Sequence, residues 1–264
     1  MSAGEQAPPR RPDFGAVVSG VTLPFCAMNA AGAVTAMSDV RALAQSRSGA
    51  VVLHTTTVHP FVHPQFRSLQ NPGFDKLAPL ARELVASGSP PVVASIAGST
   101  VEEFAFLARA FAGAGVAAVE LNLGEAWVEA TLAPCERADV LEELVGRTKE
   151  ASTAPIWVRL PERASPPYRA VVAALVTGGA RAVIARNDFT GFEKLLLDAP
   201  PTLDVVAIGS IASGYEVSRA ISKGAKAVQV GPSLGPDGIA IFGRLEREMR
   251  IARRDQTGVA HRAC

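Results

Sequence analysis

The sequence lacks the features of a membrane protein, a nucleic-acid-binding protein and a disulfide-rich protein. Although 48% of its 264 residues are hydrophobic, no apolar run approaches the roughly 20 residues that a helix needs to cross a bilayer. The formal net charge is only +1, which gives no long-range field to attract nucleic acid. The three cysteines are far apart, and no Cys-x-x-Cys pair suggests a zinc site or a disulfide framework. We therefore expect a cytoplasmic protein with no bound metal and with neither a membrane nor a nucleic acid as partner.

The two ends of the chain differ from the part between them. Residues 1–15 contain a proline- and arginine-rich stretch and lack the apolar core of a signal peptide, so they predict a flexible leader. Residues 251–264 carry Arg253, Arg254 and Arg262 and predict a frayed basic tail. Residues 16–250 are long enough to form one large domain with a sizeable core.

Short runs rich in Val, Ala and Ile alternate with amphipathic stretches along the chain, which is typical of a parallel sheet with helices between its strands. Candidate strands are residues 25–30, 50–54, 91–97, 117–122, 156–160, 182–186, 205–208 and 227–230. They predict an α/β fold, a single-domain eight-fold (β/α) TIM barrel. The rival is an open doubly wound sheet, which normally has a Gly-x-Gly-x-x-Gly turn after its first strand. No such turn is present.

Helical patterns fill the segments between the candidate strands. In residues 101–112 apolar side chains recur at helical spacing, behind overlapping capping patterns that begin at Ser99 and Thr100. Residues 215–223 predict a second helix, which Ser213 opens with a glutamate three residues later.

In a barrel of this kind the carboxyl ends of the strands form a common mouth, and active sites lie there. The candidate strands end in mostly polar residues, and these are the first candidates for ligand contacts: Asn29, His54, Thr55, Asn122, Arg159, Asn187, Gly209, Ser210 and Gly231. Residues 61–75 are long for a βα connection and predict an ordered loop over the mouth. The segment 124–135 is also long and reaches the same end.

Glycine-containing turns end the last two strands. Gly209 and Ser210 follow the seventh strand, and Gly231 and Pro232 follow the eighth. Barrels often hold a phosphate at this place with backbone N–H groups, and glycine lets the backbone come close to it. The alternative is that the glycines only make tight turns, and Pro232 has no N–H to offer. The pattern favours a phosphorylated ligand.

Several segments, in order, resemble the signature segments of the dihydroorotate dehydrogenase family. They are Met28-Asn29-Ala30-Ala31-Gly32, Val52-Leu53-His54-Thr55-Thr56-Thr57, Ser68-Leu69-Gln70-Asn71-Pro72-Gly73, Ala97-Gly98-Ser99-Thr100-Val101-Glu102-Glu103-Phe104, Val119-Glu120-Leu121-Asn122 and Ala227-Val228-Gln229-Val230-Gly231. The resemblance runs from about Gly20 to Glu248, which is nearly the whole globular part.

The resemblance implies a barrel with FMN at its mouth and a role in pyrimidine biosynthesis. In the family the FMN phosphate lies at the last two strand ends, dihydroorotate stacks on the flavin, and asparagines bind the pyrimidine. By position, the implied cofactor contacts are Ala30, Gly32, Thr55, Asn122, Arg159, Gly209, Ser210, Gly231 and Pro232. The implied substrate contacts are His54, Asn71 and Asn187.

The chain departs from the family pattern at residues that carry chemistry. His54 stands where the family has a lysine beside the flavin, and Arg159 replaces a second lysine but keeps its charge. The family's catalytic Cys or Ser after Asn122 is absent. Glu125 occupies that position and could serve as the base if burial raises its pKa, and Cys135 lies on the same loop. A glycine-rich segment and protruding strands of the family, between strands six and seven, are also missing.

Two hypotheses follow from these residues. The first is an FMN-dependent oxidoreductase that oxidises dihydroorotate or a similar cyclic amide by hydride transfer to the flavin. The second is a degenerate barrel that binds FMN, another phosphate ligand or a partner protein without turnover. The retained asparagines, turns and Arg159 favour the first, whereas the lost base and lysine favour the second. The substrate, the electron acceptor and the oligomeric state stay open, with a homodimer among the options.

Overall fold

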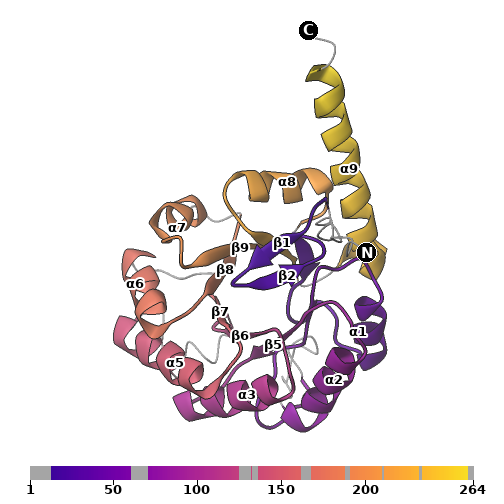
Figure 1. The fold of residues 1–264 in the computed structure, drawn as a ribbon. Helices are drawn as coiled ribbons and strands as arrows, with labels where there is room; N and C mark the ends of the chain where they lie inside the picture. The colour runs from indigo at the N-terminus through magenta and orange to yellow at the C-terminus, as the bar shows by residue number, and fades with distance from the viewer. Residues whose placement is uncertain are drawn as a thin grey trace, which may run out of the picture.

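A computed structural model describes residues 13–60, 71–124, 132, 136–161, 168–187, 191–209, 211–231 and 234–260, the last six without side chains. Eight parallel strands form one nearly closed barrel, in the order β3-β10-β9-β8-β7-β6-β5-β4 (Figure 1). Their bounds are β3 Ala27–Asn29, β4 Val51–Val52, β5 Val92–Ile96, β6 Ala118–Asn122, β7 Ile156–Arg159, β8 Ala182–Arg186, β9 Asp204–Gly209 and β10 Ala227–Val230. The predicted TIM barrel is confirmed, and its strands lie within or close to the predicted ranges.

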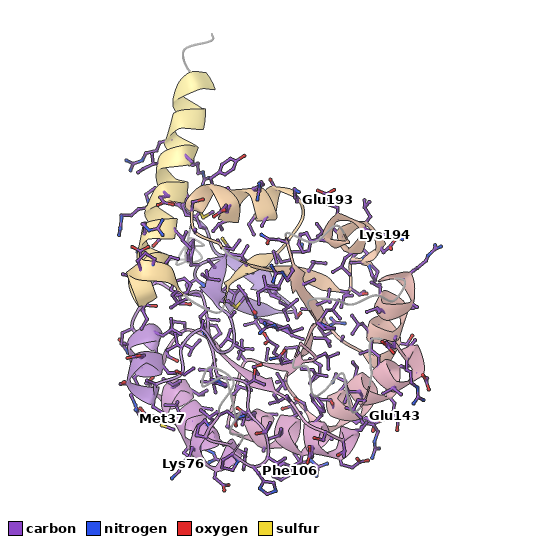
Figure 2. The ribbon with its side chains drawn as sticks, turned by 180° about the vertical axis from the view of Figure 1, so that it is seen from behind. Met37, Lys76, Phe106, Glu143, Glu193 and Lys194 are labelled. Atoms are coloured by element: carbon purple, nitrogen blue, oxygen red, sulfur yellow. The ribbon has the colours of Figure 1, made fainter. Side chains whose placement is uncertain are left out.

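Helices surround the barrel (Figures 1 and 2). They are α1 Met37–Ala44, α2 Phe74–Ala86, α3 Val101–Gly113, α5 Ala138–Ala151, α6 Tyr168–Gly178, α7 Phe192–Asp198, α8 Gly214–Ser222 and α9 Ile241–Ala260, with a 3-10 helix η2 at Gly235–Ala240. Figure 2 shows Lys76, Phe106 and Glu143 on their outer faces. Two predicted caps are present: Thr100 accepts the N–H of Glu103, and Ser213 forms a capping box with Glu216.

Two apolar clusters stabilise the fold. The larger one lies between the strands and the helices, and includes Phe104, Leu107 and Phe111 of α3. The smaller one fills the inside of the barrel and includes Met28, Val93, Trp157 and Ile184. Because successive strand residues point to opposite sides, each strand supplies both clusters. The barrel interior is therefore packed with side chains and is not a pore.

A β-hairpin closes the floor of the barrel, the end opposite the mouth. Strands β1 (Ala16–Val18) and β2 (Val21–Leu23) pair antiparallel and lie across the barrel in Figure 1. Ser19 and Gly20 both have positive φ, as a tight two-residue hairpin turn requires. Val18 and Leu23 are fully buried in the inner cluster, and the Ser19 N–H donates to the Asp204 carboxylate at 2.7 Å. The sequence pattern did not predict this hairpin.

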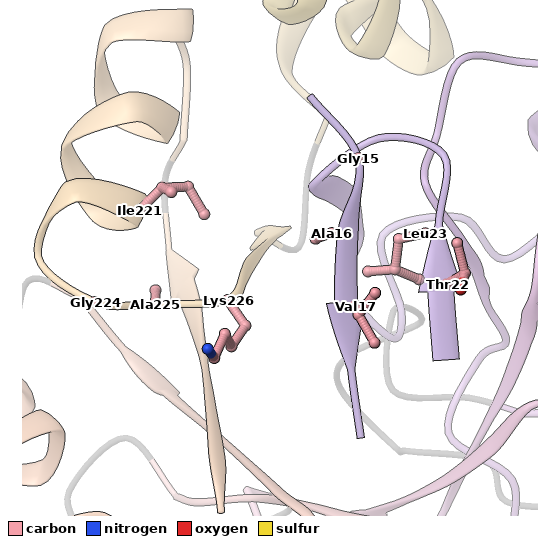
Figure 3. A pocket seen from close by; sticks show the side chains of 9 residues that line it. All are labelled: Gly15, Ala16, Val17, Thr22, Leu23, Ile221, Gly224, Ala225 and Lys226. Carbon is pink, nitrogen blue, oxygen red and sulfur yellow. The ribbon is translucent and has the colours of Figure 1, made fainter. Parts of the chain in front are cut away.

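A cavity of about 520 Å³ lies beside this hairpin (Figure 3). Val17 and Leu23 line one side, and Ile221 and Lys226 line the other. Lys226 directly precedes β10, so the cavity is at the amino end of that strand. Barrels hold their active sites at the carboxyl ends, and we therefore look for the functional site at the mouth.

The side chain of Asn29 joins the two end strands of the sheet, β3 and β4. Its Oδ1 accepts the N–H of Val52 at 2.9 Å, and its Nδ2 donates to the Val52 carbonyl at 2.7 Å. The N–H of Gly49 donates to the Ala27 carbonyl on the same side. Asn29, which we considered as a ligand contact because it ends a strand, thus substitutes for backbone pairing and closes the barrel.

The structure describes a part of both chain ends. The backbone of α9 is helical as far as Ala260, so this helix continues into the range 251–264 in which we expected a basic tail. The helix passes the amino end of α8 at a steep angle and projects beyond the barrel (Figure 1). The described residues before β1 are packed, because the Phe14 carbonyl accepts the N–H of Cys26 at 2.7 Å. No helix in the described part of the chain is long and apolar enough to cross a membrane.

Candidate functional site

The mouth of the barrel is polar because three strands end in inward-facing polar residues. On β6 the inner face carries Ala118, Glu120 and Asn122, and on β7 it carries Trp157 and Arg159. The register places Asn122 beside Arg159, and Glu120 beside Trp157 one layer deeper. On β8, Ala182 and Ile184 lie inside the barrel. Because every second residue of a strand points to the same side, Arg186 at the end of β8 also points inward. An amide and two guanidinium groups thus come from adjacent strands.

A chain of hydrogen bonds leads from the mouth into the barrel. Asn122 Nδ2 donates to Thr55 Oγ1 at 2.8 Å, and Thr55 Oγ1 lies 3.3 Å from Ser95 Oγ. Ser95 Oγ donates to Glu120 Oε1 at 3.1 Å. Asn122 Oδ1 accepts the N–H of Gly124, which holds the start of the following loop. Two predicted cofactor contacts, Thr55 and Asn122, are therefore in direct contact, although 67 residues separate them.

Glu120 is a carboxyl group that is completely buried in the barrel. Burial raises the pKa of Glu120 above its ordinary value, whereas the charge of Arg159 and hydrogen bonds from Gln229 and Ser95 oppose the rise. Gln229 Nε2 donates to Glu120 Oε2 at 2.6 Å. In the sequence, Glu120 and Gln229 stand out only as parts of family segments, and no role is expected for either. The signal was their position, because Glu120 precedes Asn122 by two residues and so lies on the same face.

His54 follows β4 and is buried. Its Nδ1 lies 3.0 Å from the carbonyl oxygen of Thr55. A carbonyl only accepts hydrogen bonds, so Nδ1 carries the hydrogen in this contact. Nε2 is then the ring nitrogen that accepts in the neutral tautomer. This geometry holds the imidazole at the mouth, where we expected a substrate contact.

Asn71 lies where the loop over the mouth rejoins the described chain. Its Oδ1 accepts the N–H of Gly73 at 2.9 Å and the hydroxyl of Thr57 at 3.1 Å. The Asn71 amide oxygen is thus used to hold the loop. Its Nδ2 has no hydrogen-bond partner within the described ranges. Gly73 has φ +79°, and a Cβ there would lie 2.7 Å from the backbone nitrogen of Pro60, so the loop returns through a position that only glycine fits.

The turns after β9 and β10 contact each other. The Gly209 carbonyl accepts two N–H groups, from Gly231 at 2.8 Å and from Ile211 at 2.9 Å. A Cβ at Gly209 would lie 2.3 Å from Oδ1 of Asn187, so the glycine leaves room for that amide. The Gly231 N–H is therefore engaged within the protein. Phosphate donors would have to come from the adjoining positions, and Ser210 and Pro232 lie outside the described residues.

The amino end of α8, beside these turns, is filled by carboxylates of the protein. Glu216 Oε2 accepts the N–H groups of Ala212 and Ser213, and Glu248 Oε2 of α9 accepts the N–H of Gly214 at 2.6 Å. Anions bind readily at such helix ends, and here two glutamates supply the charge. This helix end is therefore not open to a phosphate.

The turn after β3 leaves free space beside the mouth. Ala30 is buried, and its N–H donates to the Val230 carbonyl of β10 at 2.9 Å. Gly32 has φ +81°, and an added Cβ there would meet no atom within 4 Å. Of these two predicted cofactor contacts, Gly32 thus borders free space, whereas Ala30 is covered. The two predicted catalytic residues, Glu125 and Cys135, lie outside the described residues.

The described residues give little support for a metal site or for a reactive thiol. The described residues contain no group of three or more His, Cys, Asp or Glu side chains that could hold a metal ion. Burial raises the pKa of Cys26 to about 12, so this thiol stays protonated at neutral pH and is a poor nucleophile. The polar groups at the mouth therefore form the candidate functional site.

In sequence, the chain is similar to dihydroorotate dehydrogenases. The catalytic subunit of dihydroorotate dehydrogenase B (NAD(+)) from Geobacillus kaustophilus is 32% identical over 201 residues, which cover 66% of this chain and 63% of that protein. The corresponding subunit from Anoxybacillus flavithermus is 35% identical over 170 residues, or 58% and 53% of the two chains. This chain is a divergent member of the dihydroorotate dehydrogenase family. It spans less than two thirds of the length of these two relatives.

The fold comparison agrees with this membership. The dihydroorotate dehydrogenase of Eimeria tenella in complex with ferulenol superposes with a TM-score of 0.78 at 14% identity, covering 95% of this chain and 87% of that chain. The ligand-free form of that protein gives a TM-score of 0.79 at 13% identity, covering 91% and 88%. Likeness at this identity shows the fold alone. No protein-family model matches the chain.

Proposed function

We propose that this protein is a cytoplasmic FMN-dependent oxidoreductase that oxidises dihydroorotate or a similar cyclic amide. The observation that carries the proposal is the pairing of Asn122 with Arg159 at the mouth, in register on neighbouring strands. An amide offers donors and an acceptor to a planar heterocycle with carbonyl and N–H groups. A guanidinium keeps its positive charge at all relevant pH values and stabilises negative charge that develops on the ring.

The mouth fits the ring of a flavin better than its phosphate. Asn122, Thr55 and Arg159 would contact the ring, and the free space at Gly32, in the turn that begins at Ala30, would border it. When bound, FMN would accept the hydride. Of the described phosphate candidates, Gly209 and Gly231 bond to each other. The phosphate proposal therefore depends on N–H donors next to these glycines, such as that of Ser210.

Substrate recognition is proposed for three polar side chains around this ring site. Asn71 and Asn187 carry amides that match the alternating donors and acceptors of a cyclic amide, and His54 adds an imidazole. The Asn71 amide nitrogen and the Asn187 amide, beside Gly209, are the groups we assign to substrate.

The test of the cofactor is the absorbance spectrum of the purified protein, which should be yellow and should release FMN on denaturation. Arg159→Ala should weaken FMN binding roughly ten- to hundredfold, because one charge-assisted contact is lost. Arg181→Ala is the matched control, since this exposed arginine precedes β8 at the opposite end of the strand. Colourless protein that takes up no FMN would end the proposal.

The base is proposed to be Glu125, on the loop after Asn122. Glu125→Gln should leave FMN binding intact and slow reduction of the flavin by substrate about a hundredfold or more, the usual contribution of a positioned base. Cys135→Ser should be nearly silent in the same assay. The reverse result would move the role to Cys135.

The second candidate function is a barrel that binds a ligand or partner without turnover. The observation that favours it is the amino end of α8, where Glu216 and Glu248 occupy the backbone donors. Protein that binds FMN but is not reduced by dihydroorotate or related cyclic amides would support this alternative.

A further inference from the structure

The buried carboxyl of Glu120 has no part in the function proposed above. An isolated buried carboxylate is costly, so proteins surround such groups with donors or keep them protonated. Here one oxygen accepts from Ser95 and the other from Gln229, and Arg159 on the next strand supplies a positive charge. A well-packed apolar side chain would fill the same space without these requirements. We therefore looked for a chemical role that only a carboxyl group at this position could fill.

Two hydroxyl groups connect this carboxyl with the mouth. Thr55 Oγ1 and Ser95 Oγ can each donate one hydrogen bond while accepting another, which is the property that proton transfer along a chain needs. Asn122 donates to Thr55, and Ser95 donates to Glu120, so the hydrogens of the chain point toward the carboxyl. The link of 3.3 Å between Thr55 and Ser95 is the longest and must shorten when the proton moves.

Gln229 can serve Glu120 in either protonation state. Its Nε2 donates to the carboxylate, while its Oε1 is buried without a hydrogen-bond partner in the structure. Ser95 contacts the other carboxyl oxygen, Oε1, so a proton that arrives along the hydroxyl groups is added there. Oε2 then stays an acceptor, and both protonation states of Glu120 keep the hydrogen bond from Gln229.

The charges around Glu120 come from several elements. Arg159 on β7 is adjacent, Arg186 ends β8, and His54 follows β4. Asp204, at the floor, holds the N–H of Ser19. Among the described residues that face the barrel interior, the charged side chains nearest the mouth are thus the two arginines, with the imidazole of His54 beside the same opening.

We propose that Thr55, Ser95 and Glu120 form a proton relay that exchanges a proton between a ligand at the mouth and the buried carboxyl. An acidic N–H or O–H of the ligand gives its proton to Thr55 Oγ1 and keeps the bonding electron pair. At the same time the Thr55 hydrogen passes to Ser95 Oγ and the Ser95 hydrogen to Glu120 Oε1. The carboxylate becomes a neutral acid, no electrons are exchanged, and the reverse path returns the proton. The identity of the ligand rests on the proposed function, whereas the relay does not.

The relay is tested by infrared spectroscopy of the protein without added ligand. A protonated buried carboxyl gives a carbonyl band that shifts when its proton is replaced by deuterium. We expect such a band at acidic pH, below the raised pKa of Glu120, and we expect it to be missing in Glu120→Gln. In Ser95→Ala, deuterium should reach the carboxyl about a hundredfold more slowly after mixing with D₂O, because one proton-transfer group is lost.

Ser48→Ala is the matched control. The hydroxyl of Ser48 is also buried, but it donates to the backbone carbonyl of Ala50 and takes no part in the proposed relay. It should leave the exchange rate unchanged. Equal exchange rates in Ser95→Ala and the wild-type protein would overturn the relay, and so would the absence of any band that depends on Glu120.

Infrared spectra recorded with and without FMN, at a pH at which Glu120 of the ligand-free protein is a carboxylate, then separate the relay from the proposed function. No FMN binding would refute the cofactor and leave the infrared result on the ligand-free protein standing. FMN binding that makes the band of protonated Glu120 appear in the wild-type protein, and not in Glu120→Gln, would show that the relay serves this ligand. FMN binding that leaves the band unchanged would overturn the link between the relay and the ligand.

Discussion

The floor and the mouth of this barrel are built from the same strands but have opposite chemistry. Strand β6 begins with Ala118 inside the barrel and continues with Glu120 and Asn122, while β7 changes from Trp157 to Arg159. The floor is filled by apolar side chains and covered by a hairpin, and the mouth is lined by hydrogen-bonding and charged groups. The comparison suggests that stability is concentrated at one end of each strand and ligand binding at the other.

The largest expected effect on the free energy of unfolding is that of a substitution at the floor. Leu23→Ala removes a fully buried side chain that closes the barrel, so it should lower the free energy of unfolding by about 2–5 kcal/mol. Thr22→Ala, on the exposed face of the same strand, should have little effect. Denaturant unfolding measures both variants. If Leu23→Ala instead abolished FMN binding in folded protein, the floor would not be separate from the mouth.

Two asparagines, each at the carboxyl end of a barrel strand, sharpen the comparison. Asn29→Ala leaves the N–H and carbonyl of Val52 without their partners, at about 1–3 kcal/mol for each buried group. Asn122→Ala should cost less stability but weaken FMN binding. Unfolding curves and FMN titrations of the same two variants decide between these roles. Equal effects of both variants on stability and on binding would contradict the assignment.

Glu120 predicts a pH effect on stability that the floor lacks. Since burial raises its pKa above the ordinary 4.5, the folded protein binds more protons than the unfolded chain between that value and the raised one. Stability from this group is thus complete below pH 4.5 and is lost as the pH rises through the raised value. Glu120→Gln should remove this part of the pH dependence, so the variant gains relative to the wild type as pH rises. A pH-independent difference in unfolding free energy would show that the pKa of Glu120 is the same in the folded protein and in the unfolded chain.

The smallest expected change in stability is at the turn after β9. Gly209→Ala places a methyl group against Oδ1 of Asn187, which can rotate away, so stability should change by only about 0.5 kcal/mol. The displaced amide should reduce substrate binding. Gly49→Ala is the contrasting variant, because its Cβ would meet the carbonyl oxygen of Phe25 and cannot be accommodated by a side-chain rotation. Comparable unfolding curves for the two variants would refute this account.

The fold could be predicted from the sequence to a large extent, because its signals are local. Each strand is a short apolar run between turn residues, and the caps at Thr100 and Ser213 depend only on residues within four positions. The hairpin at the floor was missed because its strands are three residues each and too short to show alternation. The helical backbone beyond residue 250 was missed because composition, not periodicity, led us to predict a tail.

The sequence by itself thus determined the elements, the barrel and the polar strand ends, since these follow from periodicity and turn chemistry. The tertiary structure alone decided which polar groups meet. Gln229 reaches Glu120 across 109 residues, and Asp204 reaches Ser19 across 185. It also assigned Asn29 to closing the barrel and placed Asn187 against Gly209. The physical reason is that these contacts depend on strand register and on closure of the sheet, which bring together residues with no local pattern in common.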